Sequence, residues 1–164
     1  MERFEQIYNQ HREAVCAFVR RRAPESVVED VVSETFLVCW RRLNRVPAEP
    51  LPWLYAVARK TLANQRRRLE RDERLGGTPS ASVGAEPEPI GDTALAAAFA
   101  ALSEHDREVL RLVAWEGLSL VQAAVVLGCS AVACRVRYHR AKTRLARRLE
   151  AAANFRPDLK GATR

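Results

Sequence analysis

Residues 118–145 read LSLVQAAVVLGCSAVACRVRYHRAKTRL, and this stretch predicts a helix-turn-helix. Ser119 followed three residues later by Gln122 is typical of a capping box, so a short helix is expected to begin there. Gly128 is expected to end it, because glycine tolerates the left-handed conformation in which many helices stop. Ser130 is then placed to cap a second, longer helix that runs to about residue 151.

The second of these helices has two unlike faces. Residues at intervals of three and four predict an inward stripe, made of Cys134, Tyr138, Ala141, Leu145 and Leu149. The rest of the helix is basic, with seven Lys or Arg and no Asp or Glu from residue 135 to residue 148. Like charges three or four residues apart repel each other, so this density favours a polyanionic partner. A solvated basic helix remains the alternative.

A helix of this kind fits the major groove of duplex DNA. Arg135 and His139 are expected to face the base edges, on an outward side that also includes Val136. The residues expected to face phosphates are Arg137, Arg140, Lys142 and Arg144.

Helical patterns also fill the first part of the chain. Apolar residues recur at three and four between residues 4 and 19, which predicts one helix ended by Pro24. Ser26 with Glu29 is expected to form a capping box that opens a second helix. A third helix is expected over about residues 53–71.

The region before residue 118 adds one more helix, which Ser103 with Asp106 is expected to open and which should end near Gly117. The chain shows no strand-length alternation and no hairpin signal. The predicted fold class is therefore all-α.

A break in composition divides the chain. Seven of the sixteen residues of 76–91, GGTPSASVGAEPEPIG, are Gly or Pro, and no hydrophobic period runs through them. We interpret this segment as a flexible linker between two small helical domains, residues 1–75 and 92–150, followed by a tail, residues 151–164. Both domains are basic and the linker is acidic.

Composition excludes several classes of protein. The chain has 164 residues, a net charge of +7 and 48% apolar residues, which is enough to form a core. Its longest small or apolar run, residues 94–102, is far shorter than the roughly 20 residues of a membrane span, and no signal peptide is apparent at the N-terminus. The sequence therefore predicts a cytoplasmic protein without a membrane partner.

The cysteines and histidines do not form a metal pattern. Cys16, Cys39, Cys129 and Cys134 include no C-x-x-C pair, and no histidine has a partner at i+4. We expect reduced, buried or half-buried thiols, with no disulfide, metal or other cofactor.

Residues 52–68, PWLYAVARKTLANQRRR, combine aromatic and basic side chains. Aromatic rings beside cations are suited to unstacked nucleic-acid bases. A place for Trp53 and Tyr55 in the protein core is the competing interpretation.

Three motifs in this order resemble the extracytoplasmic-function sigma factors of bacterial RNA polymerase. Residues 30–40, DVVSETFLVCW, resemble the second-helix motif of sigma region 2, and residues 52–68 resemble the helix of that region that melts and reads the minus-ten element. Residues 102–145 resemble sigma region 4, which reads the minus-thirty-five element.

The resemblance implies a role for particular residues. Core polymerase would be contacted by Asp30, Ser33, Glu34 and Leu37. Melted minus-ten DNA would be held by Asn44, Trp53, Lys60 and Asn64, with Arg59, Arg66, Arg67 and Arg68 at its phosphates. Duplex minus-thirty-five DNA would be read by Arg135, Val136 and His139. The resemblance also implies an anti-sigma factor as a partner.

The chain departs from the family pattern at several of these positions. Ser33 stands where glutamine is usual, and Lys60 stands where asparagine is common. Val136 replaces a common serine, and its apolar side chain would suit a thymine methyl group rather than a hydrogen bond. We expect the fold to survive these changes and the promoter preference to differ.

The predicted function is that of a non-enzymatic transcription initiation factor, which directs core RNA polymerase to promoters and helps to open them. The alternative is a stand-alone helix-turn-helix regulator in which residues 1–75 dimerise or sense a signal. An enzyme is disfavoured because Asp30 and Glu34 form the only close acidic pair within a motif, and no phosphate-binding glycine loop is present.

Overall fold

The computed structural model describes residues 1–74 and 93–154, and within these ranges the chain is helical without any strand. The predicted all-α class is therefore confirmed. The linker expected at residues 76–91 lies outside the described residues, as does the expected tail beyond residue 154.

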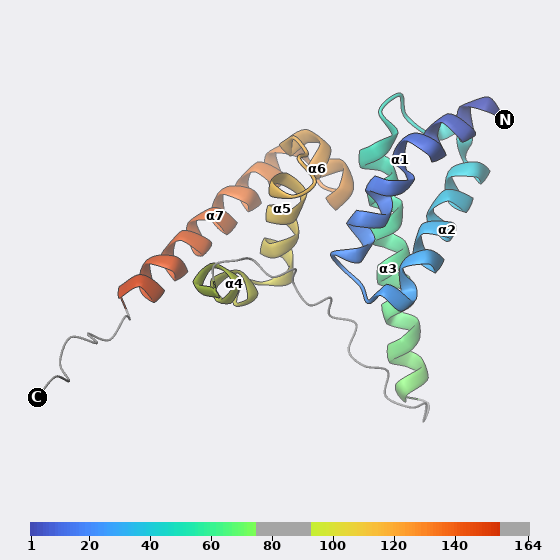
Figure 1. Ribbon diagram of the computed structural model, residues 1–164. Coiled ribbons are helices and arrows are strands. Elements are labelled where there is room, and N and C mark those ends of the chain that lie inside the picture. The colour runs from blue at the N-terminus through green and yellow to red at the C-terminus, as the bar shows by residue number, and fades with distance from the viewer. Residues whose placement is uncertain (75–92, 155–164) are drawn as a thin grey trace, which may run out of the picture.

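Three helices form the first lobe, which Figure 1 shows as a bundle at the N-terminal end. They are α1 (Glu2–Arg20), α2 (Glu25–Arg41) and α3 (Pro50–Arg74), with a single 3₁₀ turn, η1 (Leu43–Arg45), between the last two. Each helix contacts the other two. The fully buried core residues of this bundle include Val15, Phe18, Val19, Val31 and Leu54.

The second lobe contains four helices, α4 (Thr93–Ala100), α5 (Glu104–Ala114), α6 (Leu120–Leu127) and α7 (Ala131–Asn154). Its core brings together residues from all four helices, among them Phe99, Val109, Leu112, Ala123, Cys134 and Ala141. The long helix α7 runs away from the first lobe (Figure 1). Its outer side is therefore open along most of its length.

The helix-turn-helix forms as predicted. Ser119 and Gln122 make both bonds of the capping box, with the Ser119 N–H donating to Gln122 Oε1 at 2.9 Å. Gly128 ends α6 in the left-handed conformation, with φ 66°. The Ser130 hydroxyl accepts from the Ala133 N–H at 3.1 Å, and α7 follows at 101° to α6.

The capping box expected at Ser26 and Glu29 is wrong. The helix α2 begins two residues earlier than that cap would place it, at Glu25, with Pro24 as the N-cap and no side-chain cap. Ser26 is thus already inside the helix, and the Glu29 carboxylate pairs across the bundle with Arg12. Pro24 turns the chain by its restricted φ of −59°, so no polar cap is needed to begin the helix.

Several expected boundaries also shift. The helix α1 ends at Arg20 rather than at the following proline, and α3 begins at Pro50 rather than Trp53. Proline is tolerated there because the first turn of a helix has no use for its missing N–H. The short helix α4 was not predicted, since its sequence, TALAAAFA, shows no strong period.

The two lobes are docked against each other, an arrangement that the sequence did not predict. The helix α6 packs on α3, and α5 and α6 face the first lobe in Figure 1. Among the described helices, no single one is both long and apolar enough to cross a membrane, and only α6 and α7 taken together, despite their bend, meet those limits.

Candidate nucleic-acid and polymerase interfaces

The structure places the predicted DNA-reading residues on the exposed side of α7. Cys134 and Ala141, on the inner side of this helix, are completely buried, as the predicted inward stripe requires. Arg135, Val136 and His139 lie on the outside with Arg140. The exposed side is therefore cationic with an apolar strip near its beginning.

Arg144, expected to face a phosphate, makes an ion pair that was not predicted from the sequence. Its Nη1 donates to Asp106 Oδ2 of α5 at 2.7 Å, and the Asp106 side chain is almost completely buried. This ion pair holds α7 against α5. Of the other expected phosphate contacts, Arg140 and Lys142 are exposed, while Arg137 is half-buried.

The predicted single-strand residues of α3 divide into two groups. Trp53, Lys60 and Asn64 recur at intervals that place them on one side of the helix. Lys60 and Asn64 are exposed, whereas Trp53 is half-buried and packs on the core. Arg67 and Arg68 are exposed nearby, and Asn44 lies in η1 before the helix begins.

Tyr55 belongs to the core rather than to a base-stacking platform. Its ring stacks on Phe18 with the centroids 4.4 Å apart and the planes 11° apart. Burial raises the pKa of Tyr55 to about 12, and the negative charge of Glu116 adds to this effect. The competing interpretation from the sequence is therefore correct for Tyr55.

The predicted polymerase contacts share the outer side of α2. Asp30, Ser33, Glu34 and Leu37 are all exposed. A shallow groove of about 320 Å³ runs beside Ser33 and Leu37, and aromatic side chains line it, namely Phe4, Tyr8, Phe36 and Trp40. Acidic groups beside an exposed apolar groove suit a protein partner with basic and apolar side chains.

This aromatic groove was not predicted from the sequence. The Phe4 and Trp40 rings come from helices α1 and α2, and their centroids lie 5.0 Å apart. The available signal was the apolar residue Trp40 three positions beyond Leu37, on the same side of α2.

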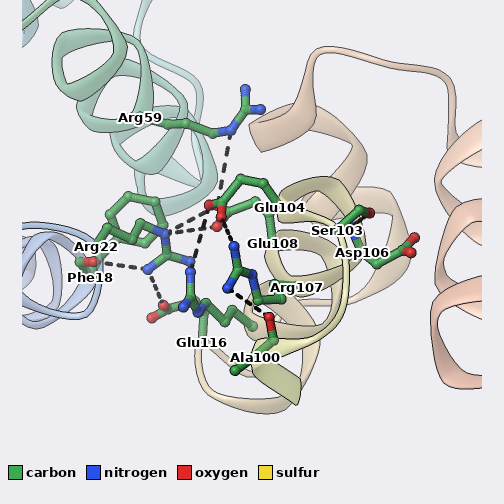
Figure 2. A network of polar contacts seen from close by, with 11 residues as sticks. Phe18, Arg22, Arg59, Ala100, Ser103, Glu104, Asp106, Arg107, Glu108 and Glu116 are labelled. Atoms are coloured by element: carbon green, nitrogen blue, oxygen red, sulfur yellow. Dashed lines mark hydrogen bonds and ion pairs between the residues drawn. The ribbon is translucent and has the colours of Figure 1, made fainter. Parts of the chain in front are cut away.

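An ion-pair network joins the two lobes, and Figure 2 shows most of it. Arg22, in the turn after α1, donates from Nε to both carboxylate oxygens of Glu108, each at 3.1 Å. Its Nη1 donates to Glu116 at 2.8 Å and to the Phe18 carbonyl at the same distance. Arg21 also pairs with Glu116. We call Arg21, Arg22, Glu108 and Glu116 the interlobe network.

This network is shielded from water. The exposed fractions of the side chains are 6% for Arg22, 7% for Glu108 and 1% for Glu116. The Arg22 guanidinium also lies 3.6 Å from the centre of the Phe18 ring. Buried charges of opposite sign that remain paired stabilise the docked arrangement, whereas removal of one partner leaves an uncompensated charge.

The docked second lobe covers part of the predicted single-strand surface. Arg59 approaches Glu108 at 4.0 Å, at the upper edge of the network in Figure 2. A cavity of about 580 Å³ between the lobes is lined by Lys60, Arg66 and Arg67 of α3 and by Arg107 and Arg111 of α5. Burial, together with the nearby positive charge of Arg22, lowers the pKa of Arg111.

The structure also places the cysteines and the possible metal ligands in the described part of the chain. The four cysteines are free thiols, with Cys129 half-buried and the other three buried. Burial raises the pKa of Cys39 and Cys134, which makes these two thiols less reactive. Residues 1–74 and 93–154 contain no group of three His, Cys, Asp or Glu side chains that could hold a metal ion.

A helical lobe with an exposed acidic and aromatic face, followed by a helix-turn-helix lobe with a cationic outer helix, is typical of DNA-binding proteins that also bind another protein. Family models agree with this class. Residues 7–72 match Sigma-70 region 2, and residues 92–145 match Sigma-70, region 4.

Individual relatives extend the match over nearly the whole chain. RNA polymerase sigma factor NccH of Alcaligenes xylosoxydans xylosoxydans is 29% identical over 163 residues, covering 91% of this chain and 88% of the relative. RNA polymerase sigma factor CnrH of Cupriavidus metallidurans is 32% identical over 149 residues, covering 78% of this chain and 76% of the relative.

A solved structure shows the same fold. The sigma factor RpoE of Bartonella quintana, in complex with the anti-sigma factor NepR, matches with a TM-score of 0.67 and 25% identity, covering 92% of this chain and 98% of that one. The chain belongs to the RNA polymerase sigma factors, in their extracytoplasmic-function group. It is a transcription initiation factor that directs RNA polymerase to promoters, and the stand-alone regulator is not favoured.

Proposed function

We propose that three surfaces of this sigma factor bind three different partners during transcription initiation. The outer side of α2, with Asp30, Ser33, Glu34 and Leu37, docks on core polymerase. The exposed side of α3, with Asn44 before it, holds melted minus-ten DNA. The exposed side of α7 reads the minus-thirty-five duplex. The observation that carries this division is the separation of one acidic, aromatic face on α2 from two cationic faces on α3 and α7.

The domain boundaries remain part of this proposal. Residues 1–75 would form the polymerase and minus-ten domain, and residues 92–150 the minus-thirty-five domain, with residues 76–91 as the tether. No nucleotide hydrolysis is invoked. Two modest DNA contacts on one tethered molecule reinforce each other through a high effective concentration, which supplies the free energy for strand opening.

The lobes must separate for both elements to be bound at once. Elements centred about 25 base pairs apart lie about 85 Å apart along B-form DNA at 3.4 Å per base pair. In the docked arrangement the lobes are in direct contact through the interlobe network. We therefore place the docked form before promoter binding and an opened form on the polymerase.

An anti-sigma factor is part of the proposal, because the Bartonella quintana relative was solved with one. A partner that bound only the docked form would keep the second lobe against the part of α3 that contains Arg59. The protein would act in the cytoplasm, where polymerase and promoter DNA are found, and would have no catalytic activity of its own.

Run-off transcription with purified core polymerase and a promoter library tests the function. We expect transcripts from a subset of promoters, none of which appear with core polymerase alone. Replacement of both Asp30 and Glu34 by alanine should reduce binding to core polymerase at least tenfold, because the acidic part of the docking face is lost. Both residues are exposed, so we expect the double variant to fold like the parent protein.

Duplex binding by the same double variant is the control, and it should equal that of the parent protein. A matched pair of exposed acids on α1, Glu5 and Glu13, can be replaced in the same way and should leave polymerase binding intact. Equal loss of polymerase and DNA binding in the Asp30 and Glu34 variant would contradict the assignment of α2.

A further inference from the structure

Two exposed valines stand at the beginning of α7. Val132 is 73% exposed and Val136 is 44% exposed. The two residues are four positions apart, so they lie one above the other on the same side of the helix. This side is opposite to that of Cys134, which is completely buried. Neither valine is required by the core of the second lobe.

The surroundings of the two valines indicate what covers them. Arg135, His139 and Arg140 flank them on the exposed side, and α7 contains no acidic residue before Glu150. A protein partner with an apolar surface would have to desolvate these cations without compensating their charge. Duplex DNA compensates it with phosphates, and the first turns of the second helix are the part of a helix-turn-helix that contacts base edges.

The one methyl group on the base edges of the major groove is the 5-methyl group of thymine. Each of the other bases presents hydrogen-bond donors or acceptors there, which valine cannot pair. Valine therefore gains by contact with a thymine methyl group and leaves a polar edge unpaired at any other base.

We propose that Val132 and Val136 form a two-residue thymine-methyl reader in the minus-thirty-five element. The proposal rests on the proposed function of α7 as the duplex-reading helix. Residues four apart on a helix are about 6 Å apart along its axis, and base pairs rise by 3.4 Å. The two valines therefore reach thymines one or two base steps apart.

Val132 is the residue that this proposal adds to the expected base-reading residues of α7. The two valines distinguish bases by the methyl group of thymine. Arg135 and His139, which lie beside them, supply the hydrogen bonds to the bases. The prediction for the promoter is a pair of closely spaced thymines, next to the bases that are read by hydrogen bonds.

The test removes the methyl group and nothing else. Duplexes are selected from a randomised minus-thirty-five library by core polymerase loaded with the full-length factor, and each thymine is then replaced by 2′-deoxyuridine. We expect two positions at which this change weakens binding of the loaded polymerase by about fourfold each, the effect of one buried methyl group. The other thymines should tolerate it.

Variants link each position to one valine. V132A should abolish the difference between thymine and deoxyuridine at one position, and V136A should abolish it at the other. V121A is the matched control, because Val121 is also strongly exposed but lies on α6. That variant should keep both differences. Circular dichroism of all three variants should match the parent, since each change is at the surface.

The outcomes of these experiments distinguish a failure of the methyl-reader proposal from a failure of the proposed function of α7. If the loaded polymerase selects sequences but binds thymine and deoxyuridine equally at every position, the methyl reader is wrong and the sigma function stands. If V132A and V136A weaken polymerase binding and leave the methyl dependence intact, the valines contact protein, which also overturns the reader. If no sequence is selected at all, the proposed function of α7 fails.

Discussion

Arg22 shows how one side chain of this factor depends on its neighbours. Its guanidinium is buried and donates to two carboxylates and a backbone carbonyl, yet Nη2 has no partner among the described residues. A cation in such a place is stable only while Glu108 and Glu116 remain charged and close. Phe18 adds a ring face beside it.

Tyr55 lies close to the interlobe network and makes stability depend on pH. Its pKa is raised from the ordinary value of 10 to about 12 in the folded state, first by burial and then by the charge of Glu116. The raised value contributes stability that is fully present below pH 10. That contribution is lost as the pH rises from about 10 to about 12, because only the unfolded chain readily releases the proton.

The corresponding variant is Tyr55→Phe, which cannot ionise. Between pH 9.5 and 11.5 the free energy of unfolding of the parent should fall by up to about 2 kcal/mol more than that of the variant. Urea unfolding followed by circular dichroism at several pH values measures this difference. Parallel curves for the two proteins across this range would show that Tyr55 is not protected in the folded state.

At the scale of elements, α7 has a proposed DNA-binding side and an ion pair with α5, and separate variants can distinguish the two. Arg140 is exposed on the outer side of the helix, whereas Arg144 is paired with the buried Asp106. About five phosphate contacts by this helix would give a slope of roughly −4 to −5 for the logarithm of affinity against the logarithm of salt concentration.

The variant Arg140→Ala should reduce the size of this slope by about 1 and leave the unfolding midpoint unchanged, because one phosphate contact is lost. The variant Arg144→Ala should destabilise the second lobe by about 1–3 kcal/mol, since the Asp106 carboxylate loses its cation. Salt-dependent anisotropy and thermal unfolding measure the two effects. Identical profiles for both variants would refute the separation of roles on α7.

The proposed binding surfaces on α2 and α3 differ in how far the docked second lobe covers them. Each has one side in the core of the first lobe and another with a proposed partner, polymerase for α2 and single-stranded DNA for α3. Docking of the second lobe covers part of α3 but leaves the predicted face of α2 exposed. The two surfaces of one lobe are thus unequally accessible in the docked form.

For the whole molecule, the proposed binding of both promoter elements requires the docked lobes to separate. The interlobe network contributes opposite charges from the two lobes, with Arg21 and Arg22 on one and Glu108 and Glu116 on the other. The neutral variants Glu108→Gln and Glu116→Gln, combined, should therefore weaken docking strongly. Removal of one partner of a buried ion pair typically costs about 3–5 kcal/mol.

Small-angle X-ray scattering measures this effect as a larger radius of gyration for the double variant. Run-off transcription should show equal or higher activity, since the opened form is the one that binds both promoter elements. Glu104→Gln is the control, because among residues 1–74 and 93–154 the exposed Glu104 pairs with Arg107 and Arg111 of its own helix and not with the first lobe. An unchanged radius in the double variant would mean that other contacts hold the lobes together.

The sequence by itself determined the local structure of this protein and the chemistry of its faces. Ser119, Gln122, Gly128 and Ser130 define the helix-turn-helix because capping and glycine conformations depend on residues within one turn. The outward side of α7 followed from the helical period alone. Such short-range rules predicted a wrong capping box at Ser26. There Pro24 precedes the helix, and Glu29 pairs with Arg12 on another helix.

Only the tertiary structure decided how the two lobes meet and which cations are already paired. Arg22 lies 86 residues from Glu108, and Arg144 lies 38 residues from Asp106. Nothing in the spacing of these residues distinguishes them from the other arginines of a basic chain. Their pairing depends on which surfaces become buried together, and burial is a property of the folded whole, because it arises from packing between segments that are distant in the sequence.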